Sequence, residues 1–136
     1  MHTVSLGRPV TDAIAINAAP QTVRAFLADA RNLPAWAPAF AEAVRPDGDT
    51  WLVSSGGSEL RIVVPTSEEH GTVDFVAAAD GRLGLFTRVL PNGDGCACVM
   101  TIVFGPGTPQ EAVDAQMTTI ASELETIRSM VETDVD

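Results

Sequence analysis

The last third of the sequence carries an apolar pattern that restricts the fold more than any other feature. A glycine- and proline-rich run at 105–109 breaks the chain, and apolar side chains then recur every three or four residues. The spacing predicts a helix of about six turns, with Thr108 as N-cap and Pro109 at the first helical position, ending near Glu132. Its apolar face needs an equally long partner. The apolar positions are Val113, Met117, Ile120, Leu124, Ile127 and Val131.

The segments before this helix predict that partner. From residue 40 onward the apolar pattern changes to period two, which is typical of strands with one buried face. Glycine, proline, asparagine and aspartate lie between these segments and favour tight hairpins. With a first strand at 10–16, the chain is expected to form a seven-stranded curved antiparallel sheet around the helix. The other six predicted strands are 40–46, 49–55, 58–65, 71–78, 83–90 and 95–104.

Two short helices are expected between the first strand and the rest of the sheet. Pro20 stands in the first turn of a helix that ends near Asp29, a position that proline favours. A second helical turn runs from Asn32 through Trp36, and Pro38 interrupts it because proline has no backbone N–H to donate. The fold class predicted from the whole chain is therefore α+β.

Length and charge limit the function classes. A chain of 136 residues fits one domain, expected to span 1–136, and its formal net charge is −10, with eight arginines and no lysine. Nucleic acid and anionic membranes are poor partners for such a surface. Nothing in Met1 to Val10 resembles a signal peptide, and no run approaches the roughly 18 apolar residues of a membrane span. We expect a cytoplasmic monomer or homodimer with no membrane insertion, and free thiols at Cys96 and Cys98.

The opening of the chain resembles a known superfamily. Residues 14–23, with Ala19-Pro20-Gln21-Thr22-Val23, precede Phe26-Leu27-Ala28-Asp29 and Asn32-Leu33-Pro34-Ala35-Trp36. They are similar to the first strand, the "APxxV" and "FLxD" helix and the "NLPxW" turn of the START and Bet v 1-like (SRPBCC) superfamily, particularly its small bacterial polyketide cyclase/dehydrase-like members. The resemblance implies a helix-grip fold whose cavity accepts lipids, aromatic polyketides or other hydrophobic molecules. Some members are enzymes and others are carriers, and no cofactor is expected.

Simple hairpin registers predict which side chains face the long helix. The outer face would then carry Arg61, Asp74 and Arg88 as a ladder of cross-strand ion pairs, although a slip of one residue would turn these charges into the cavity. The predicted inward face is almost wholly apolar. It comprises Leu60, Ile62, Val64, Val73, Phe75, Ala77, Leu83, Leu85, Thr87, Val89, Cys98, Met100, Ile102 and Phe104.

The predicted cavity offers few groups for chemistry. Cyclase-type chemistry needs a base and a donor that stabilises an enolate, and tyrosine, a common donor, is absent. Glu123 and Thr87 are the catalytic candidates. His2 and His70 are expected at the surface, and Glu68, Glu69 and His70 in one turn are too local for a metal site, so no metal is expected. The predicted ligand-binding residues are Trp36, Phe75, Leu85, Thr87, Cys98, Met100, Gln116, Thr119, Ile120 and Glu123.

The leading functional hypothesis is binding of a hydrophobic small molecule, of lipid, polyketide or aromatic type, between the sheet and the C-terminal helix. One alternative is a cofactor-free polyketide cyclase/dehydrase-like enzyme. A second is an interaction protein whose cavity is filled by its own side chains. Two polar side chains converging on a closed pocket favour the enzyme, a dry aliphatic pocket favours the binding protein, and the absence of a pocket favours the interaction protein.

Overall fold

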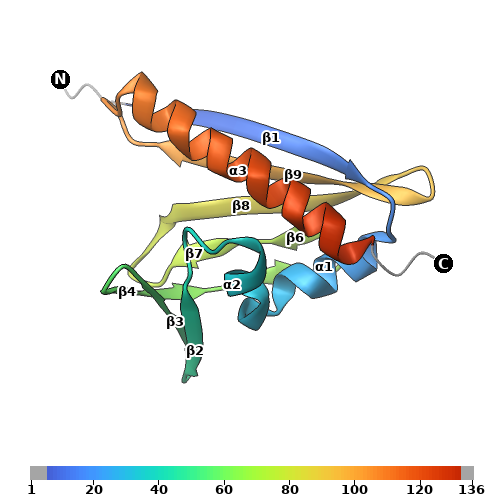
Figure 1. Ribbon diagram of the computed structural model, residues 1–136, viewed down its shortest axis with the longest axis horizontal. Coiled ribbons are helices and arrows are strands. Elements are labelled where there is room, and N and C mark those ends of the chain that lie inside the picture. The colour runs from blue at the N-terminus through green and yellow to red at the C-terminus, as the bar shows by residue number, and fades with distance from the viewer. Residues whose placement is uncertain (1–5, 133–136) are drawn as a thin grey trace.

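The computed structural model describes residues 6–132 and has the predicted α+β architecture. A curved antiparallel sheet forms one layer, and the long C-terminal helix α3 (Gln110–Val131) lies across its concave side (Figure 1). His2, expected at the surface, lies outside the described residues. The remaining elements are β1 (Arg8–Ile16), α1 (Pro20–Ala28), η1 (Ala30–Asn32), α2 (Leu33–Trp36), β2 (Ala43–Asp47), β3 (Thr50–Ser55), β4 (Ser58–Val63), β5 (Thr66–Ser67), β6 (Thr72–Val73), β7 (Phe75–Ala77), β8 (Asp80–Asn92) and β9 (Gly95–Phe104).

The sheet follows the order β1-β9-β8-β7-β4-β3-β2, so its two edge strands are β1 and β2. Each strand pairs antiparallel with its neighbour, as the hairpin signals predict. The short β5 and β6 pair with each other beside this path, and β6 also pairs with β8. The seven-stranded outline is therefore confirmed, with strands divided where the chain bends.

Asp74 causes one of these divisions. Its backbone N–H donates to the carbonyl of Pro65 at 3.0 Å, and its carboxylate accepts the backbone N–H of Thr87 at 3.0 Å. The carboxylate thus takes the place of a backbone acceptor opposite the Thr87 N–H of β8, so the predicted strand 71–78 becomes β6 and β7. The preceding strand ends at Val63, two residues before Pro65, which cannot donate to the sheet.

The observed helix ends agree with most of the boundaries predicted from the sequence and correct one of them. Pro20 stands in the first turn of α1, and α2 stops at Trp36 before Pro38. The helix α3 begins at Gln110 with Pro109 as its N-cap, so the prediction that Thr108 caps it is wrong. The Thr108 hydroxyl instead donates to the carbonyl of Gly105 at 2.7 Å, closing the turn before the helix.

The registers place the predicted apolar face toward α3. Phe75 pairs with Leu85, Thr87 with Met100, and Val89 with Cys98, and residues directly opposite each other in antiparallel strands share a face. Val73, Val89, Cys98 and Met100 are fully buried in a core shared with the buried face of α3. The alternation of apolar residues therefore gave the correct register.

The predicted ladder of charges on the outer face is wrong. Arg61 pairs with Asp47 on β2, at 2.5 Å between Nη1 and Oδ2. Arg88 donates from Nε to the carbonyl of His70 at 3.2 Å. The carboxylate of Asp74 accepts the backbone N–H of Thr87 on β8. Each group finds a nearer partner in a neighbouring hairpin or turn, so no ion pair joins the three.

Gly84 allows β8 to approach β7 closely. A Cβ added at this position would lie 2.3 Å from the carbonyl oxygen of Phe75 and 2.8 Å from the Cα of Val76. The register between the two strands shifts between Val76 and Ala77, next to this contact. The glycine therefore fixes how these strands meet at the wall of the cavity described below.

Candidate functional site

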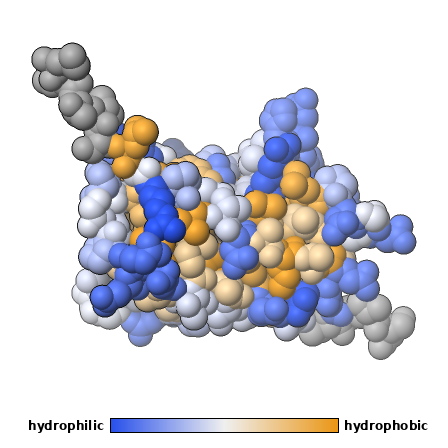
Figure 2. Space-filling view, turned by 90° about the horizontal axis from the view of Figure 1, so that it is seen from above, coloured by the Kyte–Doolittle hydropathy of each residue, from blue (hydrophilic) through white to orange (hydrophobic). Residues whose placement is uncertain are grey.

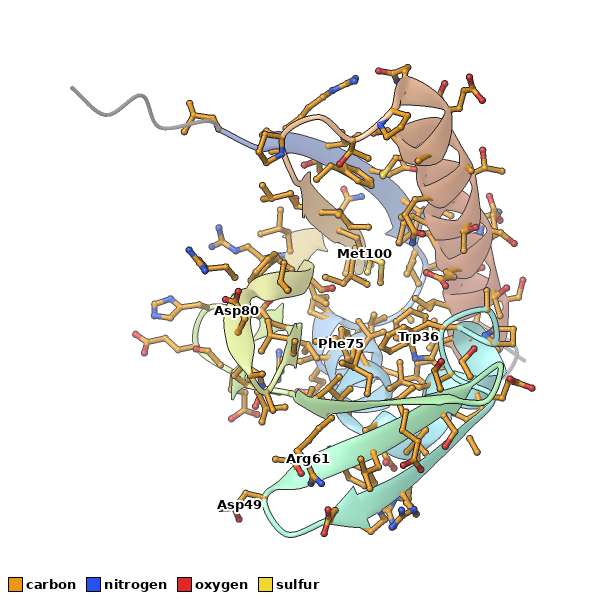
Figure 3. All side chains as sticks on the ribbon, turned by 90° about the vertical axis from the view of Figure 1, so that its left-hand side faces the viewer. Trp36, Asp49, Arg61, Phe75, Asp80 and Met100 are labelled. Carbon is orange, nitrogen blue, oxygen red and sulfur yellow. The ribbon has the colours of Figure 1, made fainter. Side chains whose placement is uncertain are left out.

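A cavity of about 300 Å³ lies between α3, α2 and the far half of the sheet. Figure 3 looks into the space between sheet and helix, with Trp36, Phe75 and Met100 pointing inward and Arg61 pointing away. At roughly 30 Å³ per molecule in the liquid, the volume equals about ten waters, the lower end of ligand pockets. The lining residues are Leu33, Trp36, Ala37, Phe40, Leu60, Ile62, Phe75, Ala77, Leu83, Gly84, Leu85, Ile102, Gln116, Ile120 and Glu123.

Three large apolar side chains of the cavity lining are exposed at the surface. Phe40 is 36% exposed, Leu60 on β4 is 44% exposed and Leu83 on β8 is 59% exposed, and all three belong to the lining. They come from three segments far apart in the sequence. Apolar groups of this size at a cavity rim cost hydration free energy when no apolar partner covers them.

Two aromatic rings form part of the inner wall. The rings of Trp36 and Phe75 meet edge to face, with centroids 5.4 Å apart and planes at 63°, an arrangement that aromatic pairs favour. Both side chains are buried. The indole Nε1–H of Trp36 has no hydrogen-bond partner among the described residues, so this wall holds one unused donor.

Glu123 is the charged residue of the lining. It is only 7% exposed, and none of the ion pairs or hydrogen bonds of the described residues involves its carboxylate. Burial raises the pKa of this carboxyl from 4.5 to about 7, because a desolvated carboxylate is disfavoured against the neutral acid. At neutral pH the group is thus divided between its two protonation states.

A shallower groove of about 340 Å³ lies on the other side of Glu123, between α2 and α3. Trp36 and Glu123 line both hollows, so they form the partition between them. Thr119 faces this groove rather than the cavity, and its hydroxyl donates to the carbonyl of Ala115 at 3.2 Å. The outer groove is lined by Ala35, Trp36, Pro38, Ala39, Thr118, Thr119, Ser122, Glu123 and Thr126.

Six of the ten predicted ligand-binding residues line the cavity: Trp36, Phe75, Leu85, Gln116, Ile120 and Glu123. The structure does not bring the other four to its wall. Thr87, Cys98 and Met100 are buried in the core, and Thr119 lies at the outer groove. Contact between any of the ten and a ligand stays a prediction.

Thr87, the second catalytic candidate, points into packed core. It is 2% exposed, and its hydroxyl oxygen has no hydrogen-bond partner among the described residues. A buried hydroxyl without a partner costs about 1–3 kcal/mol. Its position on β8 opposite Met100, away from the cavity lining, gives it no path to a molecule held there.

The two cysteines are free and buried, as predicted. Burial raises the pKa of the Cys98 thiol to about 12, and burial followed by the nearby Glu132 carboxylate raises that of Cys96. The thiolate is the reactive form. Both side chains therefore act as small apolar groups of the core.

The acidic turn near His70 is solvent-exposed. Glu68 forms an ion pair with Arg24, at 3.2 Å between Oε1 and Nη2. The Nε2 atom of His70 lies 4.0 Å from Oε2 of Glu69. Within residues 6–132 no group of three histidine, cysteine, aspartate or glutamate side chains is arranged to hold a metal ion.

Sequence reasoning missed several residues of the cavity wall. Phe40 was placed in a strand, but it belongs to the connection before β2. Leu33 is expected only to form part of a helical turn and Ala37 only to follow it, although α2 packs directly over the cavity. The apolar character of the "NLPxW" segment was the available signal for these two, because a buried short helix has to cover something apolar. Gly84 carried no signal, since only the approach of β7 reveals its role.

These features define a helix-grip domain with an apolar cavity between its sheet and its C-terminal helix. The family model described as "Polyketide cyclase / dehydrase and lipid transport" matches residues 8–132. The chain therefore belongs to this family, within the START and Bet v 1-like superfamily. No curated protein matches the sequence significantly.

Solved structures share the fold at low sequence identity. A START superfamily protein from Mycobacterium smegmatis is 14% identical with a TM-score of 0.70, covering 95% of this chain and 100% of that one. The protein Ara h 8.0201 is 14% identical with a TM-score of 0.66, covering 93% and 99%. The Aha1 dimer from Colwellia psychrerythraea is 16% identical with a TM-score of 0.71, covering 91% and 96%. At these identities the likeness shows the fold alone.

Apolar residues on one face of the molecule do not form a continuous surface. Seen from above, over β1 and the start of α3, apolar patches are separated by hydrophilic side chains (Figure 2). Among the helices of residues 6–132, none has the length and apolar character needed to cross a membrane.

Proposed function

We propose that this domain binds an apolar small molecule in the cavity between α3 and the sheet. The observation that carries the proposal is the cavity itself: about 300 Å³, walled by aliphatic and aromatic side chains and continuous with the exposed Phe40, Leu60 and Leu83. Transfer of apolar surface from water into such a wall is favourable by about 25 cal/mol per Å². A cavity of this volume also argues against the hypothesis that the protein's own side chains fill it.

The binding test uses a cavity-filling variant with a matched control. N-phenyl-1-naphthylamine, a neutral apolar probe, is titrated by fluorescence. Ala77→Phe places a ring in the lining, whereas Ala78→Phe makes the same change one residue later, in an exposed turn outside it. We expect Ala77→Phe to weaken binding at least about ten-fold and Ala78→Phe to leave the affinity unchanged.

An equal loss in both variants, or none in either, would contradict this assignment of the site. Unfolding in urea, measured for both variants, identifies an affinity loss that arises from a damaged fold. Native mass spectrometry of the freshly purified protein, with extraction on denaturation, then gives the class of any bound compound.

The cyclase/dehydrase-like alternative is favoured by one observation. The cavity wall holds a buried acid, Glu123, and the ring of Trp36 in the same wall carries a buried N–H without a partner. An acid–base group and a hydrogen-bond donor are the two kinds of group that enolate chemistry needs. The pKa of Glu123, near 7, suits an acid–base catalyst at neutral pH. Incubation of the wild-type protein with the ligand extracted from Glu123→Gln distinguishes the cases: loss of one water, or a new isomer of the same mass separated by chromatography, supports the enzyme, and an unchanged compound supports the binding protein.

A further inference from the structure

Glu123 is isolated from every other charge on both sides of the partition it forms. The cavity lining contains no second ionisable side chain, and neither does the lining of the outer groove, as far as residues 6–132 are concerned. The elements that share the cavity lining with Glu123 present Trp36 from α2 and Ala37 just after it, Phe75 and Ala77 from β7, and Leu85 from β8. No arginine of the described chain compensates its charge.

The groups around this carboxylate match one kind of ligand headgroup. An ammonium ion is bound well by a desolvated carboxylate, through charge-assisted hydrogen bonds, and by the faces of tryptophan and phenylalanine rings. Trp36, Phe75 and Glu123 line one cavity, and two of them are in ring contact. An anionic headgroup meets the opposite conditions, because the cavity offers it no cation and the chain carries a net charge of −10.

We propose that the ligand is an apolar molecule bearing one protonated amine, and that Glu123 binds this ammonium group at the inner wall of the cavity. The proposal rests on the proposed function, since it specifies the ligand of the same site. The apolar body lies along Leu60, Ile62 and Leu83 toward the rim, and the amine lies against the partition. The indole N–H of Trp36 is buried and is a donor, so it does not bind the ammonium group.

The scale of the effect follows from the cost of ionising Glu123 in the empty protein. An ammonium partner that returned the pKa of this carboxyl from about 7 to 4.5 would strengthen binding by up to about 300-fold at pH values above 7. Dehydration of the ammonium reduces this gain. We therefore expect a contribution of at least ten-fold, which grows as pH rises toward about 7 and is complete above it while the amine remains protonated.

The experiment compares two probes of the same shape. Naphthalen-2-ylmethanamine carries an ammonium where 2-ethylnaphthalene carries a methyl group, and both are measured by displacement of N-phenyl-1-naphthylamine at pH 6 and pH 8. The readout is the ratio of the two affinities, in which general changes of the cavity cancel. Wild type is compared with Glu123→Gln and with Glu123→Met, which replaces the carboxylate by an apolar chain of similar length.

Wild type is expected to favour the ammonium probe at least ten-fold more than either variant does at pH 8, with a smaller difference at pH 6. If 2-ethylnaphthalene binds and the affinity ratio is the same in wild type and both variants, the ammonium proposal is overturned and the apolar site stands. If neither naphthalene probe displaces bound N-phenyl-1-naphthylamine from wild type, the ammonium proposal is overturned and the apolar site stands. If N-phenyl-1-naphthylamine itself does not bind wild type, the proposed function is overturned as well.

Discussion

Replacing Glu123 by glutamine tests the central feature of the site without any ligand. The carboxyl is 7% exposed and has no hydrogen-bond or charged partner among the described residues, and burial moves its pKa from 4.5 to about 7. The amide of Glu123→Gln has nearly the same shape and does not ionise. The two proteins should therefore differ in how their stability depends on pH.

The size and sign of this difference follow from proton linkage. Below pH 4.5 the carboxyl is protonated in both the folded and the unfolded chain, so it contributes nothing. Between pH 4.5 and about 7 the folded chain keeps the proton that the unfolded chain releases, so stability falls as pH rises. Above pH 7 both states are ionised and the loss of stability is constant. It amounts to about 3 kcal/mol, because each unit by which the two pKa values differ contributes ~1.4 kcal/mol.

Urea unfolding at intervals from pH 4 to pH 9 measures the effect. The free energy of unfolding of Glu123→Gln, relative to wild type, should rise by about 3 kcal/mol across this range and level off near pH 8. Glu111→Gln, which removes an exposed carboxylate from the first turn of the same helix, controls for the change in net charge. A difference that stays within about 1 kcal/mol at all pH values would refute the argument that Glu123 is desolvated in the folded protein.

Three further predictions concern the core around the cavity. Thr87→Val should leave the protein as stable or stabilise it by about 1 kcal/mol in urea unfolding, because it removes a buried hydroxyl without a partner; a clear loss of stability would reveal a hydrogen bond. Gly84→Ala should destabilise by about 1–3 kcal/mol, since the new Cβ meets the Phe75 carbonyl, and an unchanged midpoint would contradict that contact. A thiol reagent at pH 8 should label Cys96 and Cys98 only after unfolding, and rapid labelling of the native protein would disprove their burial.

The elements of this fold were predictable because each has a local cause. The apolar stripe from Val113 to Val131 needs a helix, alternation from Val73 to Ile102 needs strands with one buried face, and Pro20 and Pro38 mark the short helices. These signals depend on residues a few positions apart in the sequence. Local agreement of this kind is what makes a register unambiguous.

The errors have long-range or competing causes. Thr108 has a side chain suited to an N-cap, but its hydroxyl donates to the carbonyl of Gly105. The helix begins one residue later than expected. Asp74 divides a strand because its carboxylate is placed against the backbone of Thr87, thirteen residues away. The order of apolar and polar residues does not reveal that the Thr108 hydroxyl bonds to Gly105 or that the Asp74 carboxylate bonds to Thr87.

The candidate site was predictable only in part, for a geometric reason. Alternation places Phe75, Leu85, Cys98 and Met100 on the same concave face, and the registers confirm this. Only the first two reach the cavity, whereas the sulfur-containing pair is buried in the core. The face of a side chain follows from the sequence, but the distance between that face and the covering helix does not.

That distance varies along the sheet because α3 is held at one side of it. The helix packs most extensively against the edge strand β1, and its contacts with the sheet decrease from there, as Figure 1 shows by its course along β1 and β9. The cavity is lined by β4, β7 and β8, with only Ile102 from β9 and nothing from β1. A straight helix lying along one edge of a curved sheet leaves a wedge at the other, and α2 closes only part of it. Glu123 lies on the side of α3 that faces this wedge, which is why a carboxylate on the edge of an apolar stripe lines a cavity and not a packed core.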